Sequence, residues 1–204
     1  MKILLTGASS GIGKSVKRLL PLAHNCEIIV PSRSELDLDM PGVTQSYANH
    51  MPADIDVLIN CAGHDMGGKV PFVDHAMTQV QNIMQTNLLG PMTLTQAVLR
   101  NNPKATIINV TSMNVMRHGN NDLAYTLSKK ALHEFTELLR TEYRDARIIE
   151  VRPGLVKTNF NQARFEGRAA DNLYNNKHMS PDYVADELIR ALTVAHITLV
   201  EINP

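Results

Sequence analysis

Short apolar runs alternate with longer stretches of helical periodicity along this chain. Runs such as Ile3-Leu4-Leu5 and Val57-Leu58-Ile59 are apolar at every position, and longer helical patterns separate them from the next run. Continuous apolar character is typical of strands that are buried on both faces, as they are in parallel sheets. The alternation therefore predicts an α/β fold, in which one doubly wound, mostly parallel sheet carries helices on both faces.

The boundaries of these elements follow from the apolar periods and from prolines. We expect six strands, the last of them edge-like, at Ile3 to Leu5, Glu27 to Val30, Val57 to Ile59, Thr106 to Val110, Ile148 to Val151 and Ile197 to Ile202. We expect helices at Gly13 to Leu20 with Pro21 after it, at 74–89, 91–100, 122–143 and 181–193. The alternative for the second and third is one long helix bent at Gly90-Pro91.

Length and composition narrow the class of protein. The chain has 204 residues, which predicts one domain over 1–204. Its 20 Lys and Arg residues balance 20 Asp and Glu residues, so neither nucleic acid nor a membrane surface is an expected partner. No apolar run approaches the roughly 20 residues of a membrane span, and no export signal is evident, which favours the cytoplasm. The eight His and two Cys residues form no zinc-binding pattern, and we expect no metal.

A glycine-rich loop follows the first predicted strand and opens the first helix. Its sequence is Thr6-Gly7-Ala8-Ser9-Ser10-Gly11-Ile12-Gly13, with the spacing G-x-x-x-G-x-G. Glycines let the backbone approach a phosphate closely, and the start of a helix supplies free N–H donors and positive potential. We therefore expect a phosphate on Gly7, Ser9, Ser10, Gly11, Ile12 and Gly13, although the same loop could be a tight turn that binds nothing.

The segment after the second strand bears on the choice of dinucleotide. A dinucleotide-binding sheet recognises the adenosine ribose there, with an acidic residue for NAD or an arginine for NADP. Arg33, beside Ser32, can make a forked contact to a 2′-phosphate, whereas Glu35 could accept from a 2′-hydroxyl. Arg33 comes first after the strand, so we predict a preference for NADP(H), with NAD(H) possible. An exposed arginine with no role is the other alternative.

Three residues form a potential proton-transfer group. Tyr125 and Lys129 are spaced i and i+4 and so lie on one helical face. A phenol with a pKa near 10 is a poor acid or base at neutral pH, but a nearby ammonium favours the phenolate. Ser112 follows the strand at Thr106 to Val110, at the end of the sheet where ligands bind. A Tyr–Lys pair alone also occurs by chance on solvated helices, so its combination with the loop carries the prediction.

Together these motifs resemble the short-chain dehydrogenase/reductase superfamily, in the branch whose loop reads TGxxxGxG. Tyr125 and Lys129 match its YxxxK motif, and Asn87 falls where the family has a catalytic asparagine. Three further stretches are similar to family motifs: Asn60-Cys61-Ala62-Gly63 to NNAG, Asn109-Val110-Thr111-Ser112 to the strand motif that ends in the catalytic serine, and Pro153-Gly154-Leu155-Val156-Lys157-Thr158 to PGxVxT.

The resemblance implies a Rossmann-like fold and hydride transfer between a nicotinamide and a small carbonyl or alcohol substrate. Tyr125 would be the general acid or base, and Lys129 would assist it and hold the nicotinamide ribose. Ser112 would orient the substrate oxygen, and Asn87 would hold a water that relays protons. The cofactor would also contact Ser32, Arg33, Asp37, Leu38, Asn60, Ala62, Gly63, Pro153, Gly154, Val156 and Thr158.

The resemblance also raises expectations outside these motifs. A homodimer or homotetramer is implied, and the polar segment at about 159–177 would be a short substrate lid. The stretch from Arg33 to Asn60 is too short for the family's usual helix and full third strand. His64 and Arg117-His118 could recognise an acidic or polar substrate, or could be solvated loop ends. A nucleotide-binding sensor with little turnover is the alternative to an enzyme, disfavoured because Asn87, Ser112, Tyr125 and Lys129 are all present.

Overall fold

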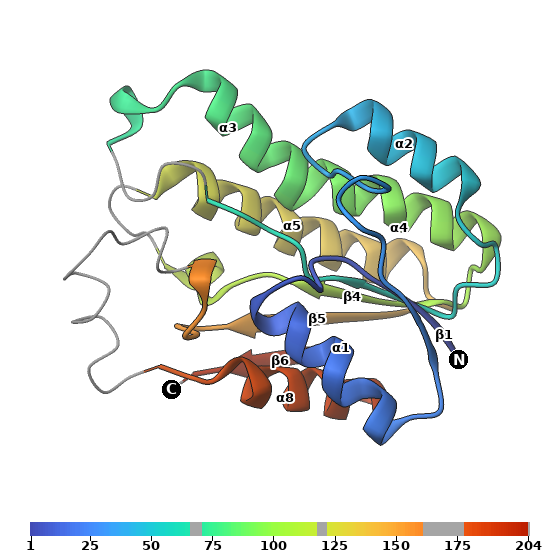
Figure 1. The fold of residues 1–204 in the computed structure, drawn as a ribbon. Coiled ribbons are helices and arrows are strands. Elements are labelled where there is room, and N and C mark those ends of the chain that lie inside the picture. The colour runs from blue at the N-terminus through green and yellow to red at the C-terminus, as the bar shows by residue number, and fades with distance from the viewer. Residues whose placement is uncertain (66–70, 118–121, 161–177, 204) are drawn as a thin grey trace.

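The computed structural model describes residues 1–65, 71–117, 122–160 and 178–203 (Figure 1). It contains a six-stranded, entirely parallel sheet in the order β2-β1-β3-β4-β5-β6. Its strands are β1 (Lys2–Leu5), β2 (Glu27–Ile29), β3 (Val57–Asn60), β4 (Thr106–Val110), β5 (Arg147–Pro153) and β6 (Leu199–Ile202). Its α-helices are α1 (Gly11–Ala23), α2 (Pro41–His50), α3 (Met77–Met84), α4 (Gly90–Asn101), α5 (Leu123–Glu142) and α8 (Pro181–Thr193). The predicted fold class is confirmed.

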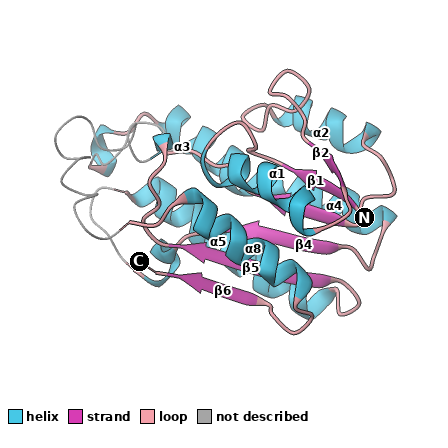
Figure 2. Cartoon of the chain, turned by 60° about the horizontal axis from the view of Figure 1, so that its bottom comes forward, coloured by secondary structure: helices cyan, strands magenta, loops and turns pink. Residues whose placement is uncertain are grey.

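Two helical layers cover the sheet, one on each face. Helices α1 and α8 lie side by side on one face, and α2, α4 and α5 lie on the other (Figures 1 and 2). Successive strand residues alternate between the two cores: Ile3 and Leu5 belong to the core under α1 and α8, while Leu4 belongs to the other. The central strands are therefore apolar at consecutive positions because both faces are buried.

Helix boundaries depart from the sequence pattern at two prolines. Helix α1 continues through Pro21 to Ala23, so the prediction that it ends at Leu20 is wrong. A proline near the end of a helix forfeits one backbone hydrogen bond while the earlier turns stay intact. The predicted bend at Gly90-Pro91 is also misplaced, because the irregularity is a π-helix over Gln85–Leu89. Pro91 lies in the first turn of α4, where its missing N–H matters least.

The segment between Arg33 and Asn60 confirms one expectation and corrects another. It forms α2, which begins at Pro41, so of the helix and full third strand that the segment was predicted to be too short for, the helix is present. Within the described residues no strand lies between β2 and β3, and β2 lies at the edge of the sheet. Strand β2 also ends at Ile29, one residue earlier than predicted, close to Pro31, which cannot donate to a ladder. Among the described helices, none is long and apolar enough to cross a membrane.

Candidate active site

A cavity of about 1010 Å³ opens at the carboxyl ends of the strands. The strand order reverses between β1 and β3, and ligands of open α/β sheets bind in the crevice at such a reversal. The cavity runs from the segments that follow β1 and β2 to the segments that follow β4 and β5. It is therefore an elongated site whose two ends can be considered separately.

The glycine loop forms one wall of the cavity and is tightly packed. Gly7 has a φ of +73°, and a Cβ there would lie 2.7 Å from the Ala62 Cα. A Cβ on Gly13 would lie 2.2 Å from the Gly7 carbonyl oxygen. Helix α1 begins at Gly11 with no acidic residue in its first turn, so its positive end faces the cavity. The loop fits a phosphate, although packing alone already requires these two glycines.

Arg33 lines the end of the cavity that lies beyond β2, and it is ion-paired. Its side chain is 75% exposed, and it donates to Asp39 Oδ2 at 2.7 Å and to Asp37 Oδ2 at 3.2 Å. Hydrogen bonding and charge from the two aspartates raise its pKa. Asp39 also accepts from the Thr86 hydroxyl and from the His64 ring. A 2′-phosphate at this position would compete with two carboxylates for the Arg33 guanidinium.

Glu35, the residue that would favour NAD, is held by Ser32. Its Oε2 accepts from the Ser32 backbone N–H at 2.8 Å and from the Ser32 hydroxyl at 2.7 Å. These hydrogen bonds lower the pKa of the Glu35 carboxyl. Arg33 lines the cavity, whereas Glu35 is not among its lining residues.

Lys129 and Tyr125 lie at the opposite end, both on α5. Lys129 is only 5% exposed, and its Nζ donates to the Val110 carbonyl oxygen at 2.9 Å. The same Nζ lies 6.0 Å from the centre of the Tyr125 ring. Burial lowers the pKa of Lys129 to about 8, and the charge effect of Cys61 acts in the opposite direction. The charged ammonium is therefore still the main form at pH 7, but it loses its proton only about one pH unit higher.

Ser112 reaches the same end from β4. It caps a short 3-10 helix, Met113–Met116, by accepting at Oγ from the Asn114 N–H at 3.2 Å. Tyr125 is buried, and its ring centre lies 5.5 Å from that of Phe160, which belongs to the described start of the predicted lid. Three predicted catalytic residues, Ser112, Tyr125 and Lys129, thus line one end of one cavity.

Asn87 lies behind this end, in the π-helix, and is fully buried. Its Oδ1 accepts from the His64 N–H at 2.9 Å, and its Nδ2 donates to the His64 carbonyl and to the Ser128 hydroxyl, both at 3.0 Å. The side chain therefore anchors the segment after β3. Its predicted role in holding a water stays a prediction.

Asn60 is the other predicted site residue that does not line the cavity. Its Nδ2 donates to Asn109 Oδ1 at 2.8 Å and so joins β3 to β4. The remaining predicted residues all line it: Gly7, Ser9, Ser10, Gly11, Ile12, Gly13, Ser32, Arg33, Asp37, Leu38, Ala62, Gly63, Ser112, Tyr125, Lys129, Pro153, Gly154, Val156 and Thr158.

Comparison with known proteins agrees with this geometry. A family model described as short chain dehydrogenase matches residues 37–169. An NADP-dependent 3-hydroxy acid dehydrogenase from Schizosaccharomyces pombe is 36% identical over 226 residues, covering 94% of this chain and 86% of the relative. The chain belongs to the short-chain dehydrogenase family. It is therefore an oxidoreductase of the dehydrogenase/reductase class.

Solved structures show the same fold as this short-chain dehydrogenase. The closed form of a serine dehydrogenase complexed with NADP+ superposes with a TM-score of 0.84 at 25% identity, covering 100% of this chain and 95% of that one. An alcohol dehydrogenase from Thermococcus sibiricus, complexed with 5-hydroxy-NADP, superposes with a TM-score of 0.83 at 20% identity, covering 99% and 95%. At that identity the second likeness concerns the fold alone.

Several residues that line the cavity of this dehydrogenase were not predicted. Lys17 follows Gly13 by one helical turn, a spacing that could have indicated it. Asp122, which accepts from Asn114 Nδ2 at 3.1 Å and from the Thr126 hydroxyl at 3.0 Å, gave no sequence signal. Of the predicted lid, only Asn159 and Phe160 fall within the described residues; 161–177 and His118 lie outside them.

Proposed function

We propose that this enzyme uses NADP(H) to interconvert a hydroxyl and a carbonyl group on the third carbon of a small hydroxy acid. The observation that carries the chemistry is the convergence of Ser112, Tyr125 and Lys129 at one end of a cavity whose other end is a glycine loop. The substrate class is supported by the S. pombe relative, named for 3-hydroxy acids. Serine, named in the serine dehydrogenase, also carries its hydroxyl on the third carbon.

Tyr125 is the residue proposed to move the proton. Its hydroxyl would donate to the substrate oxygen in reduction and accept the proton in oxidation. The Lys129 ammonium would stabilise the phenolate form by its charge, and burial between α5 and β4 strengthens that interaction. Ser112, fixed by the Asn114 N–H, would orient the substrate oxygen beside Tyr125.

The rest of the cavity fits a nicotinamide dinucleotide, which supplies or accepts the hydride when bound. The start of α1 would hold its phosphates, and Arg33 with Ser32 would hold the adenosine 2′-phosphate. NADP is favoured because Glu35 is engaged by Ser32 and because the S. pombe relative is NADP-dependent. The nicotinamide end would lie against Pro153, Gly154, Val156 and Thr158, which line the cavity beyond β5.

Arg117 is the residue proposed to hold the substrate carboxylate. It follows the 3-10 helix that Ser112 caps, lines the cavity and is exposed. The other exposed cations that line the described part of the cavity, Lys17 and Arg33, belong to the nucleotide end. In the described portion of the chain, no carboxylate is ion-paired with Arg117.

Turnover with a panel of substrates tests this proposal. Purified enzyme is assayed with NADP+ and with NAD+ on L-serine, 3-hydroxypropionate and 3-hydroxybutyrate, and on the methyl ester of each. We expect NADP+ reduction with at least one acid, a higher KM for its ester, and near-complete loss of turnover in Tyr125→Phe with NADPH binding kept. A Tyr125→Phe variant that keeps most of its turnover would show that Tyr125 is not the acid.

The substrate class has its own control. Arg117→Gln is expected to raise the KM for the acid by at least tenfold and to leave the ester unchanged, because one charge-assisted contact is lost. Arg100 lies in the last turn of α4 and outside the cavity, so Arg100→Gln should change neither the KM for the acid nor that for the ester. Faster turnover of the esters than of the acids in the native enzyme would contradict an acid substrate but not the dehydrogenase chemistry.

We also propose that the chain self-associates as a homodimer or homotetramer, as the family resemblance implies. The exposed apolar residues Leu127 and Leu138 on α5, 49% and 63% exposed, agree with a helix that a second copy covers. Light scattering on the purified enzyme tests this. That the enzyme is located in the cytoplasm stays a prediction.

A further inference from the structure

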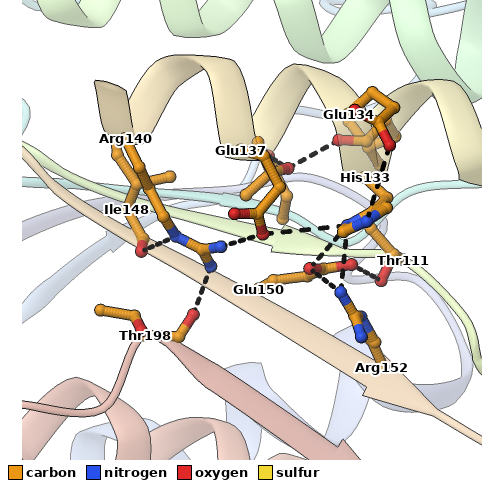
Figure 3. A network of polar contacts seen from close by, with 12 residues as sticks. Thr111, His133, Glu134, Glu137, Arg140, Ile148, Glu150, Arg152 and Thr198 are labelled. Atoms are coloured by element: carbon orange, nitrogen blue, oxygen red, sulfur yellow. Dashed lines mark hydrogen bonds and ion pairs between the residues drawn. The ribbon is translucent and has the colours of Figure 1, made fainter. Parts of the chain in front are cut away.

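A buried ion pair lies on the face of β5 that α5 covers (Figure 3). Neither of its residues, Glu150 and Arg152, is among those that line the cavity. Glu150 is fully buried, and the Arg152 side chain is 7% exposed. Arg152 Nη2 donates to Glu150 Oε2 at 2.9 Å. Two charges in the middle of a parallel sheet are unexpected, because such strands are normally apolar and because desolvating an ion pair is costly.

The pair is bonded to both segments that carry the catalytic end of the cavity. The Thr111 hydroxyl donates to Glu150 Oε1 at 2.7 Å, and Thr111 directly precedes Ser112. Arg152 directly precedes Pro153, where the nicotinamide loop begins. The Arg152 Nη1 also lies 3.7 Å from the sulfur of Met116, at the end of the 3-10 helix that Ser112 caps.

The contact between Thr111 and Glu150 lies at the end of the backbone ladder that joins β4 and β5. The register between β4 and β5 ends at Val110 opposite Val151, with one more hydrogen bond from Thr111 N to the Val151 carbonyl at 2.8 Å. Ser112 and Pro153 lie beyond that point. The Glu150 carboxylate therefore adds a side-chain bond to Thr111, the last residue after β4 that main-chain pairing with β5 reaches.

The other side of the pair is held by neighbouring elements. Arg152 Nη1 donates to Glu201 on β6 at 2.8 Å, and Arg152 Nη2 lies 3.0 Å from the His133 Nδ1 on α5. His133 in turn lies 3.1 Å from Glu150 Oε2 (Figure 3). The pair is thus contacted from both α5 and β6.

A metal site is a poorer explanation of the same cluster. His133, Glu137 and Glu150 bring possible ligand atoms within 4.8 Å of one another. Arg152 already donates to Glu150, and Arg140 donates to Glu137. Two guanidinium groups therefore supply the positive charge that a metal ion would bring.

We propose that Glu150 is a positioning residue that sets the nicotinamide loop at Pro153-Gly154 relative to Ser112. It acts through Thr111 on one strand end and through Arg152 on the other, and touches neither substrate nor cofactor. Displacing the end of either strand would misalign the reacting groups, but it would leave the binding of the adenosine half of the cofactor unchanged. Sub-ångström to ångström displacements of this kind are enough to slow an enzyme severely.

The test separates the nicotinamide end of the cavity from the adenosine end. Dissociation constants are measured by fluorescence and calorimetry for NADPH and for adenosine 2′,5′-bisphosphate, which lacks the nicotinamide half. The variants are Glu150→Gln and Thr111→Val, the second of which leaves the ion pair intact and keeps the test valid if the first does not fold. The matched control is Glu137→Gln, whose side chain is 44% exposed at the far edge of the same network.

Both Glu150→Gln and Thr111→Val are expected to raise the dissociation constant for NADPH by about tenfold and to change that for adenosine 2′,5′-bisphosphate by no more than about twofold. In the substrate assay, kcat should fall by on the order of tenfold with a smaller change in KM. Equal losses for both ligands, unchanged NADPH binding in Thr111→Val, or the same loss in Glu137→Gln would overturn the proposal. If the native enzyme binds NADH instead, NADH and AMP replace the two ligands, and only the NADP assignment is contradicted.

Discussion

Two buried cations lie close to the ends of neighbouring strands, and they are held in opposite ways. The Lys129 ammonium donates to the Val110 carbonyl on β4, and no carboxylate is paired with it among the described residues. The Arg152 guanidinium on β5 is bonded to Glu150 and Glu201. Both side chains are largely removed from water, so the difference between them is the presence of a counter-charge.

The pKa directions follow that difference. Burial lowers the pKa of Lys129 from 10.5 to about 8. The pKa of Arg152 is raised, first by its hydrogen bond to Glu150. Burial by itself raises the pKa of the Glu150 carboxyl, but bonds from Arg152 and Thr111 outweigh it, and the pKa falls below its ordinary value. Burial of a charge without a counter-charge costs stability, and groups with such perturbed pKa values cluster at functional sites, whereas a compensated pair costs stability when one partner is removed.

The largest expected effect belongs to Lys129→Met. Turnover should fall by about 10³-fold, because the charge that stabilises the Tyr125 phenolate is lost. The free energy of unfolding at pH 7 should rise by about 2 kcal/mol. The substitution removes the cost of burying the charge, about 3 kcal/mol from the drop in the Lys129 pKa, but it also loses the hydrogen bond to Val110, which contributes about 1 kcal/mol. Urea unfolding and a kinetic assay measure both. Lys104→Met, on an exposed residue, is the control, and a less stable Lys129→Met would break the comparison.

Arg152→Met should have the opposite effect on stability. It leaves the Glu150 carboxylate buried with only Thr111 and His133 as partners, so the free energy of unfolding should fall by about 3 kcal/mol. Arg190→Met removes an exposed pair with Glu187 and should change stability little. If urea unfolding shows the same loss in the free energy of unfolding for both variants, the Glu150–Arg152 pair contributes no more to stability than a surface pair.

Arg33 extends the comparison to an exposed, compensated cation. Arg33→Ala should weaken NADPH binding by on the order of tenfold, because a forked contact to the 2′-phosphate is lost, and should leave NADH binding nearly unchanged. Stability should hardly change, since pairs with Asp37 and Asp39 at a 75% exposed side chain contribute little. Fluorescence titration with both cofactors measures the effect. Equal losses for NADPH and NADH would refute the assignment of Arg33.

The smallest effect is a pH dependence that only the uncompensated cation should give. Between pH 8 and 10.5 the unfolded chain keeps the Lys129 proton that the folded protein has lost, so folding stability rises with pH through that window. Cys61, whose pKa burial raises to about 11, acts in the opposite direction above pH 9. Unfolding at pH 7.5 and pH 9 should therefore show a gain of about 1 kcal/mol in the native protein relative to Lys129→Met. An identical pH response in the two proteins would contradict a lowered Lys129 pKa.

The sequence by itself determined the parallel sheet and most of the cavity lining. Apolar strands buried on both faces, a glycine loop between strand and helix, and the spacing of Tyr125 and Lys129 are local features that need no tertiary information. Because all strands are parallel, every segment after a strand comes to the same edge of the sheet. Sequence order was therefore enough to bring the glycine loop, Ser112 and Pro153 together.

Only the tertiary structure decided how individual side chains are used. The pattern around Ile148 to Val151 indicated a buried strand but not a Glu150–Arg152 pair completed by α5 and β6. Asn87 and Asn60 match motif positions, yet their side chains bond to the protein behind the cavity. Local periodicity cannot reveal such partners, because they come from segments distant in the chain. Packing therefore decides which of the two buried cations has a counter-charge.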